Sequence, residues 1–276
     1  NKGFVEPDFT LFGQSGTRVS LHLRNGQQII SKTDSRGEEG RLFLQYKKQR
    51  DFPVMPGIGI PKIVDAWMGK SFTMEYVPSV TLGTYAQDAP HLEWKSITDK
   101  LVAFLEKNLE ESTTSGQLLS KQEGFSQKMA GLREKIRLPQ DTAQSSTLVE
   151  LEKLSGHLPF RSGRNHGDFS YENILVSKKD GGLWLVDFLD SPIDSPLIDA
   201  GRILIDCEHG WWFTGSKSSA PEQLAGTHLA RKIRIMLEAQ GVMDEEIRFF
   251  KLFAALRVLP YTSVPTRRSI LLSIIS

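Results

Sequence analysis

The sequence has 276 residues, of which 39% are hydrophobic and 24% are charged, a composition typical of folded globular domains and not of disordered or fibrous chains. Lys and Arg total 34 against 33 for Asp and Glu, a formal net charge of +1, so no overall charge excess indicates a nucleic acid or an anionic membrane as partner. The single cysteine, Cys207, excludes an intramolecular disulfide framework and a cysteine-rich zinc site. No run approaches the ~18 apolar residues of a membrane span, and we expect a cytoplasmic protein.

The first part of the chain has the patterns of β-strands. Four segments are short and apolar or alternate between apolar and polar residues: 9–12, 17–32, 60–67 and 71–77. Asn25-Gly26 interrupts the second segment and supplies the positive φ angles that a tight hairpin turn requires. Residues 38–50 instead show helical spacing. The sequence therefore predicts two antiparallel hairpins with a helix between them.

Helical patterns dominate after residue 90. The segments with this pattern are 90–109, 198–207, 222–240 and 244–259. Two stretches rich in Ser, Thr, Gln and Gly, 112–127 and 138–147, are expected to be loops. The change of pattern near residues 78–90 predicts an α+β architecture of two lobes, with a β-rich lobe at 1–77 and a mainly helical lobe at 78–276.

A polar loop followed by a short hairpin carries the strongest chemical signal. The loop runs His166-Gly167-Asp168 to Asn173, and two apolar strands then lead to Asp187. A hairpin of that length brings Asn173 and Asp187 side by side, and an amide oxygen and a carboxylate are ligands that suit Mg²⁺. Asp168 lies one loop away and is free to accept a proton. Phosphoryl transfer requires a carboxylate that orients the attacking hydroxyl and a metal that neutralises phosphate charge.

Each of these residues also has an ordinary structural interpretation. Single Asp and Asn residues in loops mostly form turns or cap helices. Their joint spacing around a hairpin is harder to produce by chance, so we favour the functional interpretation.

The pattern His-Gly-Asp-x-x-x-x-Asn, an apolar strand and Asp-Phe-x-Asp resembles the catalytic region of the aminoglycoside phosphotransferase family, small-molecule kinases of the protein-kinase-like fold. The resemblance implies a bilobal fold, ATP (or GTP) and Mg²⁺ as cofactors, and a small-molecule hydroxyl as acceptor. It also implies that Asp168 is the catalytic base, that Asn173 and Asp187 bind magnesium, and that His166 is a structural member of the catalytic loop.

Two further aspartates match this resemblance less specifically. Asp199, in Pro-Leu-Ile-Asp-Ala-Gly, matches the buried aspartate that braces the catalytic loop in the family, although a helix N-cap is an equally good interpretation. Asp190 lies three residues beyond Asp187 and is expected to hold a second metal ion or an acceptor amine or hydroxyl.

The N-terminal lobe is the expected nucleotide-binding part. Gly13 and Gly16 frame a turn whose backbone N–H groups can approach phosphates. Lys32 ends the third strand, where kinase-like folds hold the lysine that binds the nucleotide phosphates. An exposed lysine at a strand end is the plainer alternative for Lys32.

An acidic residue near the start of the following helix is expected to pair with Lys32. We prefer Glu39 to Glu38, because Phe43 and Tyr46 then fall on the packing face of the helix. A charge that complements the helix dipole is the alternative interpretation of this glutamate.

The segment between the predicted lobes, Met74 to Leu82, resembles the family's linker, which reads the adenine edge through backbone groups. The carbonyl of Glu75 and the amide of Val77 are the expected pair. Ser79 departs from the glycine that the family usually has after Pro78.

We therefore expect an ATP-dependent kinase that moves the γ-phosphoryl group to an alcohol, a sugar or aminoglycoside-like hydroxyl. Asp206 to Trp212 offers carboxylates and aromatic rings to such an acceptor, although tryptophans are more often core residues. A nucleotide-binding scaffold without catalysis is one alternative. A protein Ser/Thr kinase is another, which Ser219-Ala-Pro-Glu222 favours, while Gly167 in place of the arginine that follows the histidine and the predicted helix after Asp199 speak against it. The oligomeric state is not predicted.

Overall fold

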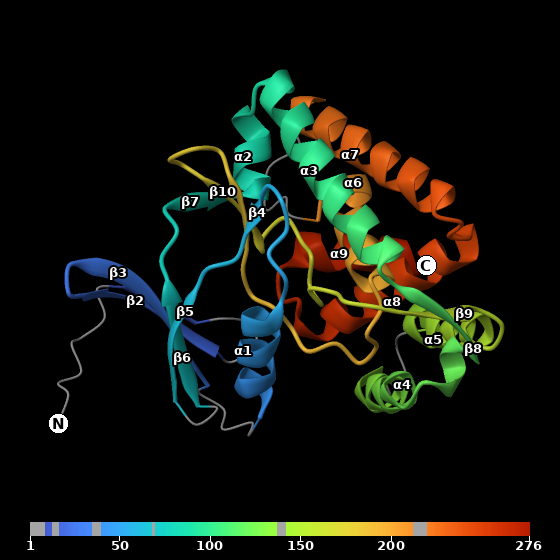
Figure 1. The fold of residues 1–276 in the computed structure, drawn as a ribbon. Coiled ribbons are helices and arrows are strands. Elements are labelled where there is room, and N and C mark those ends of the chain that lie inside the picture. The colour runs from blue at the N-terminus through green and yellow to red at the C-terminus, as the bar shows by residue number, and fades with distance from the viewer. Residues whose placement is uncertain (1–8, 13–16, 35–39, 68–69, 137–141, 212–219) are drawn as a thin grey trace. The chain divides into compact units, whose positions relative to one another are not determined.

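The computed structural model describes residues 9–12, 17–34, 40–67, 70–136, 142–211 and 220–276 (Figure 1). The chain forms two compact units. The first consists of Asn1–Val80 and Ile174–Asp190, and the second of Thr81–Asn173 and Ser191–Ser276. Among the described residues, no helix combines the length and the apolar character that crossing a membrane requires.

The first unit contains a five-stranded antiparallel sheet in the order β1-β2-β3-β6-β5. Its strands are β1 (Phe9–Phe12), β2 (Thr17–Arg24), β3 (Gln27–Asp34), β5 (Ile63–Trp67) and β6 (Ser71–Glu75). Asn25 and Gly26 join β2 to β3 with φ angles of 53° and 77°, the left-handed conformation that a two-residue hairpin turn needs. Both predicted hairpins are confirmed.

Helix α1 (Arg41–Asp51) packs against this sheet, as the helical spacing indicated. Leu42 forms a buried cluster with Phe72 and Met74 of β6, and Tyr46 packs against it. Phe43 is 47% exposed, so the expectation that it lies on the packing face was wrong. The face of α1 that packs on the sheet contains Leu42 in place of Phe43.

A second sheet of the first unit contains the hairpin of the predicted metal site. Its order is β4-β11-β10-β7, with β4 (Ile58–Gly59), β7 (Ser79–Thr81), β10 (Ile174–Ser177) and β11 (Leu183–Leu185). β10 and β11 pair in antiparallel register from Ile174 opposite Leu185, which confirms the predicted hairpin. β4 approaches β11 closely because Gly59 has no side chain; a Cβ there would lie 2.7 Å from the Trp184 ring.

The second unit is mainly helical. Its helices are α2 (Leu82–Asp88), α3 (His91–Glu110), α4 (Glu123–Ile136), α5 (Thr142–Ser155), α6 (Leu197–His209), α7 (Ala220–Ala239), α8 (Asp244–Val258) and α9 (Pro265–Ile275), with 3₁₀ turns η1 (Leu119–Lys121) and η2 (Leu259–Tyr261). A two-stranded sheet joins β8 (Thr113–Leu118) to β9 (Pro159–Ser162).

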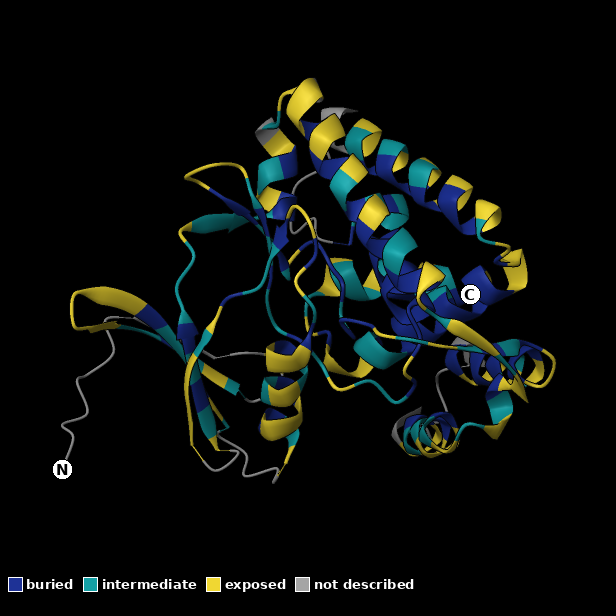
Figure 2. Cartoon of the chain, in the orientation of Figure 1, coloured by how far each residue is buried: buried dark blue, intermediate teal, exposed yellow. Residues whose placement is uncertain are grey.

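Helix α6 lies at the centre of this unit. Every residue from Leu197 to Cys207 is buried (Figure 2), and α6 packs against α3, α7 and α8. Gly201 permits the contact with α8, because a Cβ there would lie 2.6 Å from the carbonyl carbon of Phe250. A polar group on α6 therefore needs a partner inside the protein.

The expectation of loops at 112–127 and 138–147 was wrong. The first stretch contains β8, η1 and the start of α4, and the second contains the start of α5. Isolated apolar residues anchor these elements, since Leu119, Phe125 and Leu148 are all buried. Polar composition alone predicted loops because it does not register single apolar anchors that tertiary packing buries.

Candidate functional site

The loop that precedes β10 is fastened to α6 through Asp199. The Asp199 carboxylate accepts the backbone N–H groups of His166, at 2.5 Å, and Gly167, at 2.9 Å. Gly167 has φ 93°, a left-handed conformation that L side chains rarely adopt. Asp199 is the third residue of α6 and only 1% exposed. The N-cap interpretation is wrong, since Pro196 occupies the cap position.

The side chain of His166, in this loop, is fully buried. Its Nδ1 accepts the backbone N–H of Asp168 at 3.3 Å, and its ring meets Phe169 edge-on. Phe169 in turn stacks on Phe104 of α3, with ring centroids 4.8 Å apart. These contacts bury the histidine, and its role as a structural member of the catalytic loop stays a prediction.

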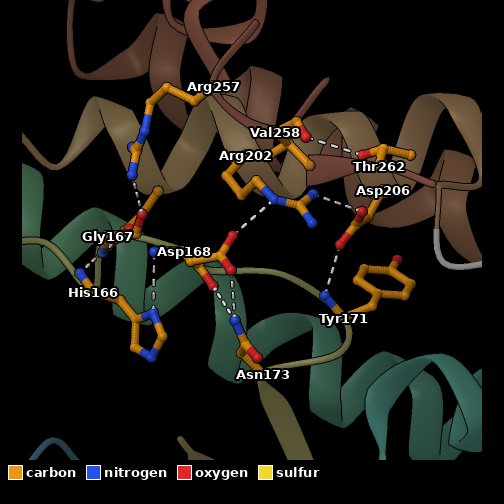
Figure 3. A network of polar contacts seen from close by, with 11 residues as sticks. His166, Gly167, Asp168, Tyr171, Asn173, Arg202, Asp206, Arg257, Val258 and Thr262 are labelled. Atoms are coloured by element: carbon orange, nitrogen blue, oxygen red, sulfur yellow. Dashed lines mark hydrogen bonds and ion pairs between the residues drawn. The ribbon is translucent and has the colours of Figure 1, made fainter. Parts of the chain in front are cut away.

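Asp168 is held from two sides (Figure 3), and its side chain remains partly exposed to solvent. The Asn173 side-chain amide Nδ2 donates to Asp168 Oδ2 at 2.9 Å and to the Asp168 backbone carbonyl at 2.9 Å. Arg202 Nε donates to the other carboxylate oxygen, Oδ1, at 2.9 Å. The Asp168 side chain is 27% exposed, so this fixed side chain is still partly accessible to solvent.

Arg202 and Asp206 form a buried ion pair on the same face of α6 as Asp199. Arg202 Nη1 lies 2.8 Å from Asp206 Oδ1, and Asp206 Oδ2 accepts the backbone N–H of Tyr171 at 2.7 Å (Figure 3). Burial raises the pKa of Asp206 to about 6, against the opposing effect of Arg202 and of the Tyr171 N–H. Burial by itself lowers the pKa of Arg202, but Asp206 and Asp168 more than offset it, so the guanidinium stays charged.

Sequence analysis missed Arg202. The signal was present, because residues 199, 202 and 206 recur at helical spacing and are the charged residues of the segment Leu197 to Cys207, which is otherwise without charge. The sequence also suggested that Asp206 belongs to the acceptor region. In the structure, this carboxylate instead binds the Arg202 side chain and the Tyr171 backbone N–H. Trp211 is buried, and Trp212 lies outside the described residues.

The first unit holds a second charged pair. Lys32 Nζ of β3 lies 2.8 Å from Asp187 Oδ1, with the lysine side chain 6% and the aspartate side chain 50% exposed. Asp187 has φ 63°, in the left-handed region that Asp tolerates better than most residues. Lys48 of α1 donates to the backbone carbonyl of Leu189 at 2.7 Å and so fixes the segment that follows Asp187.

Comparison with known proteins identifies the family of this chain. A sequence model described as "Phosphotransferase enzyme family" matches residues 74–236, which is more than half of the chain. The chain belongs to this phosphotransferase family. The predicted kinase-like α+β fold and the predicted transfer of a phosphoryl group to an alcohol are confirmed. No curated protein matches the sequence significantly.

Solved structures of phosphotransferases share the fold at low sequence identity. Aminoglycoside phosphotransferase APH(4)-Ia, in a ternary complex with AMP-PNP and hygromycin B, is 16% identical with a TM-score of 0.65, and the match covers 100% of this chain and 94% of that one. Choline kinase LicA from Streptococcus pneumoniae is 15% identical with a TM-score of 0.59, over 94% and 89% of the two chains. A glucosamine kinase is 13% identical with a TM-score of 0.52, over 99% and 79%.

The predicted adenine-binding residues and Asp190 of this phosphotransferase lie outside the two clusters described above. Glu75 donates its backbone N–H to the Lys62 carbonyl at 3.0 Å, and the Val77 carbonyl accepts a hydrogen bond from Ser79 Oγ at 2.8 Å. Neither bond uses the Glu75 carbonyl or the Val77 amide that was expected to read adenine. Asp190 is exposed.

Some expected contacts stay predictions. Gly13, Gly16, Glu38 and Glu39 lie outside the described residues. Asn173 belongs to the second unit and Asp187 to the first, and each is described within its own unit, so their shared magnesium ion is a proposal.

Proposed function

We propose that this phosphotransferase transfers the γ-phosphoryl group of ATP to a hydroxyl group of a small molecule, a sugar or aminoglycoside-like acceptor, with Asp168 as the base. The observation that carries the proposal is the Asp168 carboxylate itself. Both of its oxygens have a fixed donor, Arg202 and Asn173, and 27% of the side chain is still exposed. A carboxylate in this state can orient a hydroxyl group without first having to become ordered.

The donor set of the predicted magnesium site fits a hard cation. Asn173 uses its amide nitrogen for both bonds to Asp168, which leaves the amide oxygen as the ligand atom. Asp187 is half exposed and carries a carboxylate, a ligand group that hard cations prefer. Magnesium usually binds one or two protein oxygens together with phosphates and water. Bound there, it would neutralise negative charge on the phosphates.

Lys32 supports the nucleotide part of the proposal. Its ammonium group is buried and paired with the Asp187 carboxylate, which places a cation next to the predicted metal ligand. Phosphate oxygens are the natural further partners of such a lysine. We therefore assign Lys32 to the α- and β-phosphates of the nucleotide.

In the proposed step, the acceptor hydroxyl donates its hydrogen bond to Asp168. The hydroxyl oxygen forms a bond to the γ-phosphorus while the bond from that phosphorus to the β,γ-bridging oxygen breaks. The hydroxyl proton passes to the Asp168 carboxylate, and ADP leaves with the bridging oxygen. The protein contributes orientation and charge stabilisation, which are the main requirements of phosphoryl transfer.

The class of acceptor is proposed from the similar structures and from the carboxylates of this chain. Similar structures are named for aminoglycosides, glucosamine and choline, all of which carry hydroxyl groups. A polycationic acceptor would need free carboxylates, and Asp206 is not free. Asp206 therefore does not support a polycationic acceptor, whereas Asp190 is exposed, and the proposal keeps both a sugar and an aminoglycoside-like hydroxyl.

A non-catalytic nucleotide-binding scaffold is the second candidate. An ADP-release assay with ATP and Mg²⁺ over a panel of sugars, amino alcohols and aminoglycosides separates the two, with Asp168→Asn as the matched variant. We expect release with at least one acceptor and its loss in Asp168→Asn, while calorimetry shows that both proteins bind ATP. Binding by both proteins with release by neither would instead support the scaffold, and phosphorylation of protein substrates would support a protein kinase.

A further inference from the structure

Among the described residues, Arg202 is the one residue of α6 whose side chain forms a hydrogen bond with the predicted catalytic base. It is 5% exposed, and its guanidinium group spans two carboxylates, those of Asp168 and Asp206 (Figure 3). We propose that Arg202 is a positioning residue, which sets the orientation of the Asp168 carboxylate for proton acceptance. This inference rests on the function proposed above.

The carboxylate of an aspartate rotates easily, because the torsion about its last bond has broad minima. In this structure two donors on different elements oppose that rotation. Arg202 Nε on α6 binds Oδ1 at 2.9 Å, and Asn173 Nδ2 on the loop binds Oδ2 at 2.9 Å. Each carboxylate oxygen keeps lone-pair capacity beyond one hydrogen bond. The carboxylate is therefore fixed in direction and still able to accept the proton of a hydroxyl group.

Arg202 is itself held in place. Asp206, four residues later on α6, binds Nη1 at 2.8 Å and is anchored to the backbone of Tyr171. The guanidinium carbon also lies 5.8 Å from the centroid of the Trp211 ring. A planar guanidinium group delivers two donors at a fixed angle, which the single ammonium group of a lysine cannot do. Asp168 is thus linked, through Arg202 and Asp206 of α6, to the backbone of its own loop at Tyr171.

Stability alone does not account for this arginine. Moving a charged pair into a protein interior is costly, and well-packed apolar residues often serve a core as well or better. All the residues of α6 from Leu197 to Cys207 are buried, and most of them are apolar. An arginine among them fits a role that apolar residues cannot fill, and contact with Asp168 supplies that role.

Three variants test the proposal. Arg202→Met removes the charge and both donors, and Arg202→Lys keeps the charge without the planar fork. Arg161→Met is the matched control, because Arg161 of β9 forms another ion pair in the same unit, with Glu246, which is 1% exposed. The hydrogen bonds of Arg161 go to Glu246 and to the Gly241 carbonyl. Each protein is assayed for kcat and for KM for ATP, and its thermal unfolding is recorded.

We expect Arg202→Met to lower kcat by ~100-fold, the usual cost of misplacing a reacting group, with KM for ATP unchanged. Arg202→Lys should recover part of kcat and should fold, because it keeps a buried cation next to Asp206. Arg161→Met should lose stability but keep kcat. A wild-type kcat in Arg202→Met, or an equal loss of kcat in Arg161→Met, would overturn the proposal.

A crystal structure of Arg202→Lys gives a second measurement that requires no acceptor. We expect the Asp168 carboxylate to rotate or to occupy more than one orientation. The wild-type orientation, held by Asn173 alone, would overturn the positioning role. Wild-type protein that releases no ADP with any acceptor would instead overturn the proposed function, while the orientation of Asp168 would still decide this inference.

Discussion

Asp199 and Gly167, 32 residues apart, are joined by a hydrogen bond of 2.9 Å from the glycine N–H to the aspartate carboxylate. The same carboxylate accepts the N–H of His166, so one buried acid satisfies two backbone donors. It thereby fixes the start of the loop that carries Asp168. The bond couples the centre of the helical unit to the predicted catalytic loop.

Asp199→Ala should therefore destabilise the protein and impair catalysis together. Two buried N–H groups lose their acceptor, and each costs ~1–3 kcal/mol when left without one. Urea unfolding measures the free energy of unfolding, and the ADP-release assay measures kcat. Asp194→Asn, a change at an exposed aspartate, is the control and should alter neither quantity; a stable and fully active Asp199→Ala would contradict the bracing role.

Asp206 makes stability depend on pH in a defined direction. Its pKa is raised to about 6 in the folded protein, chiefly by burial, whereas an unfolded aspartate titrates near ~3.9. The folded state thus holds this proton more tightly. Protonated Asp206 therefore stabilises the folded state fully below pH ~4. This stabilisation, roughly 3 kcal/mol, is lost as the pH rises from ~4 to about 6.

Asp206→Asn removes this titration. The free energy of unfolding of the wild type, minus that of Asp206→Asn, should fall between pH 4 and 6 and then level off, as measured by urea unfolding at each pH. Asp65→Asn, a change at a strongly exposed carboxylate, should give no such slope. A difference between wild type and Asp206→Asn that is constant across this range would refute the prediction.

Lys32→Met should weaken nucleotide binding. The variant removes the ammonium group that lies 2.8 Å from Asp187 Oδ1, and with it the proposed contact to the phosphates. We expect the Kd for ATP with Mg²⁺, measured by calorimetry, to rise by at least ~10-fold, as the loss of one charge-assisted hydrogen bond implies. Lys47→Met, on the exposed side of α1 in the same unit, should bind as the wild type does; equal binding by Lys32→Met would argue against the assignment.

Gly201→Ala tests the packing of α6 against α8. The new Cβ would lie 2.6 Å from the carbonyl carbon of Phe250, so one helix must move. We expect a loss of ~1–3 kcal/mol in the free energy of unfolding, typical of overpacking. Gly131→Ala in α4 has open space at its Cβ and should stabilise by ~0.5–1 kcal/mol, because alanine favours helix. Similar unfolding midpoints for the two variants would show that α6 and α8 separate easily.

The hairpins, the long helices and the motif from His166 to Asp187 could be predicted from the sequence. They depend on features that neighbouring residues carry, such as the Asn25-Gly26 turn and the 3.6-residue periodicity. The five-residue spacing of Asp168 and Asn173 belongs to the same class, since the two side chains meet across one short loop.

Only the tertiary structure decided what surrounds those residues. Arg202 reaches Asp168 across 34 positions in the sequence, and Lys32 reaches Asp187 across 155. Such contacts depend on which helix faces are buried and on how closely two backbones approach, as at Gly201. A pattern of neighbouring residues in the sequence encodes neither of these. The stretches at 112–127 and 138–147 illustrate the same point. They form helices and strands because other parts of the chain cover the few apolar side chains of these elements.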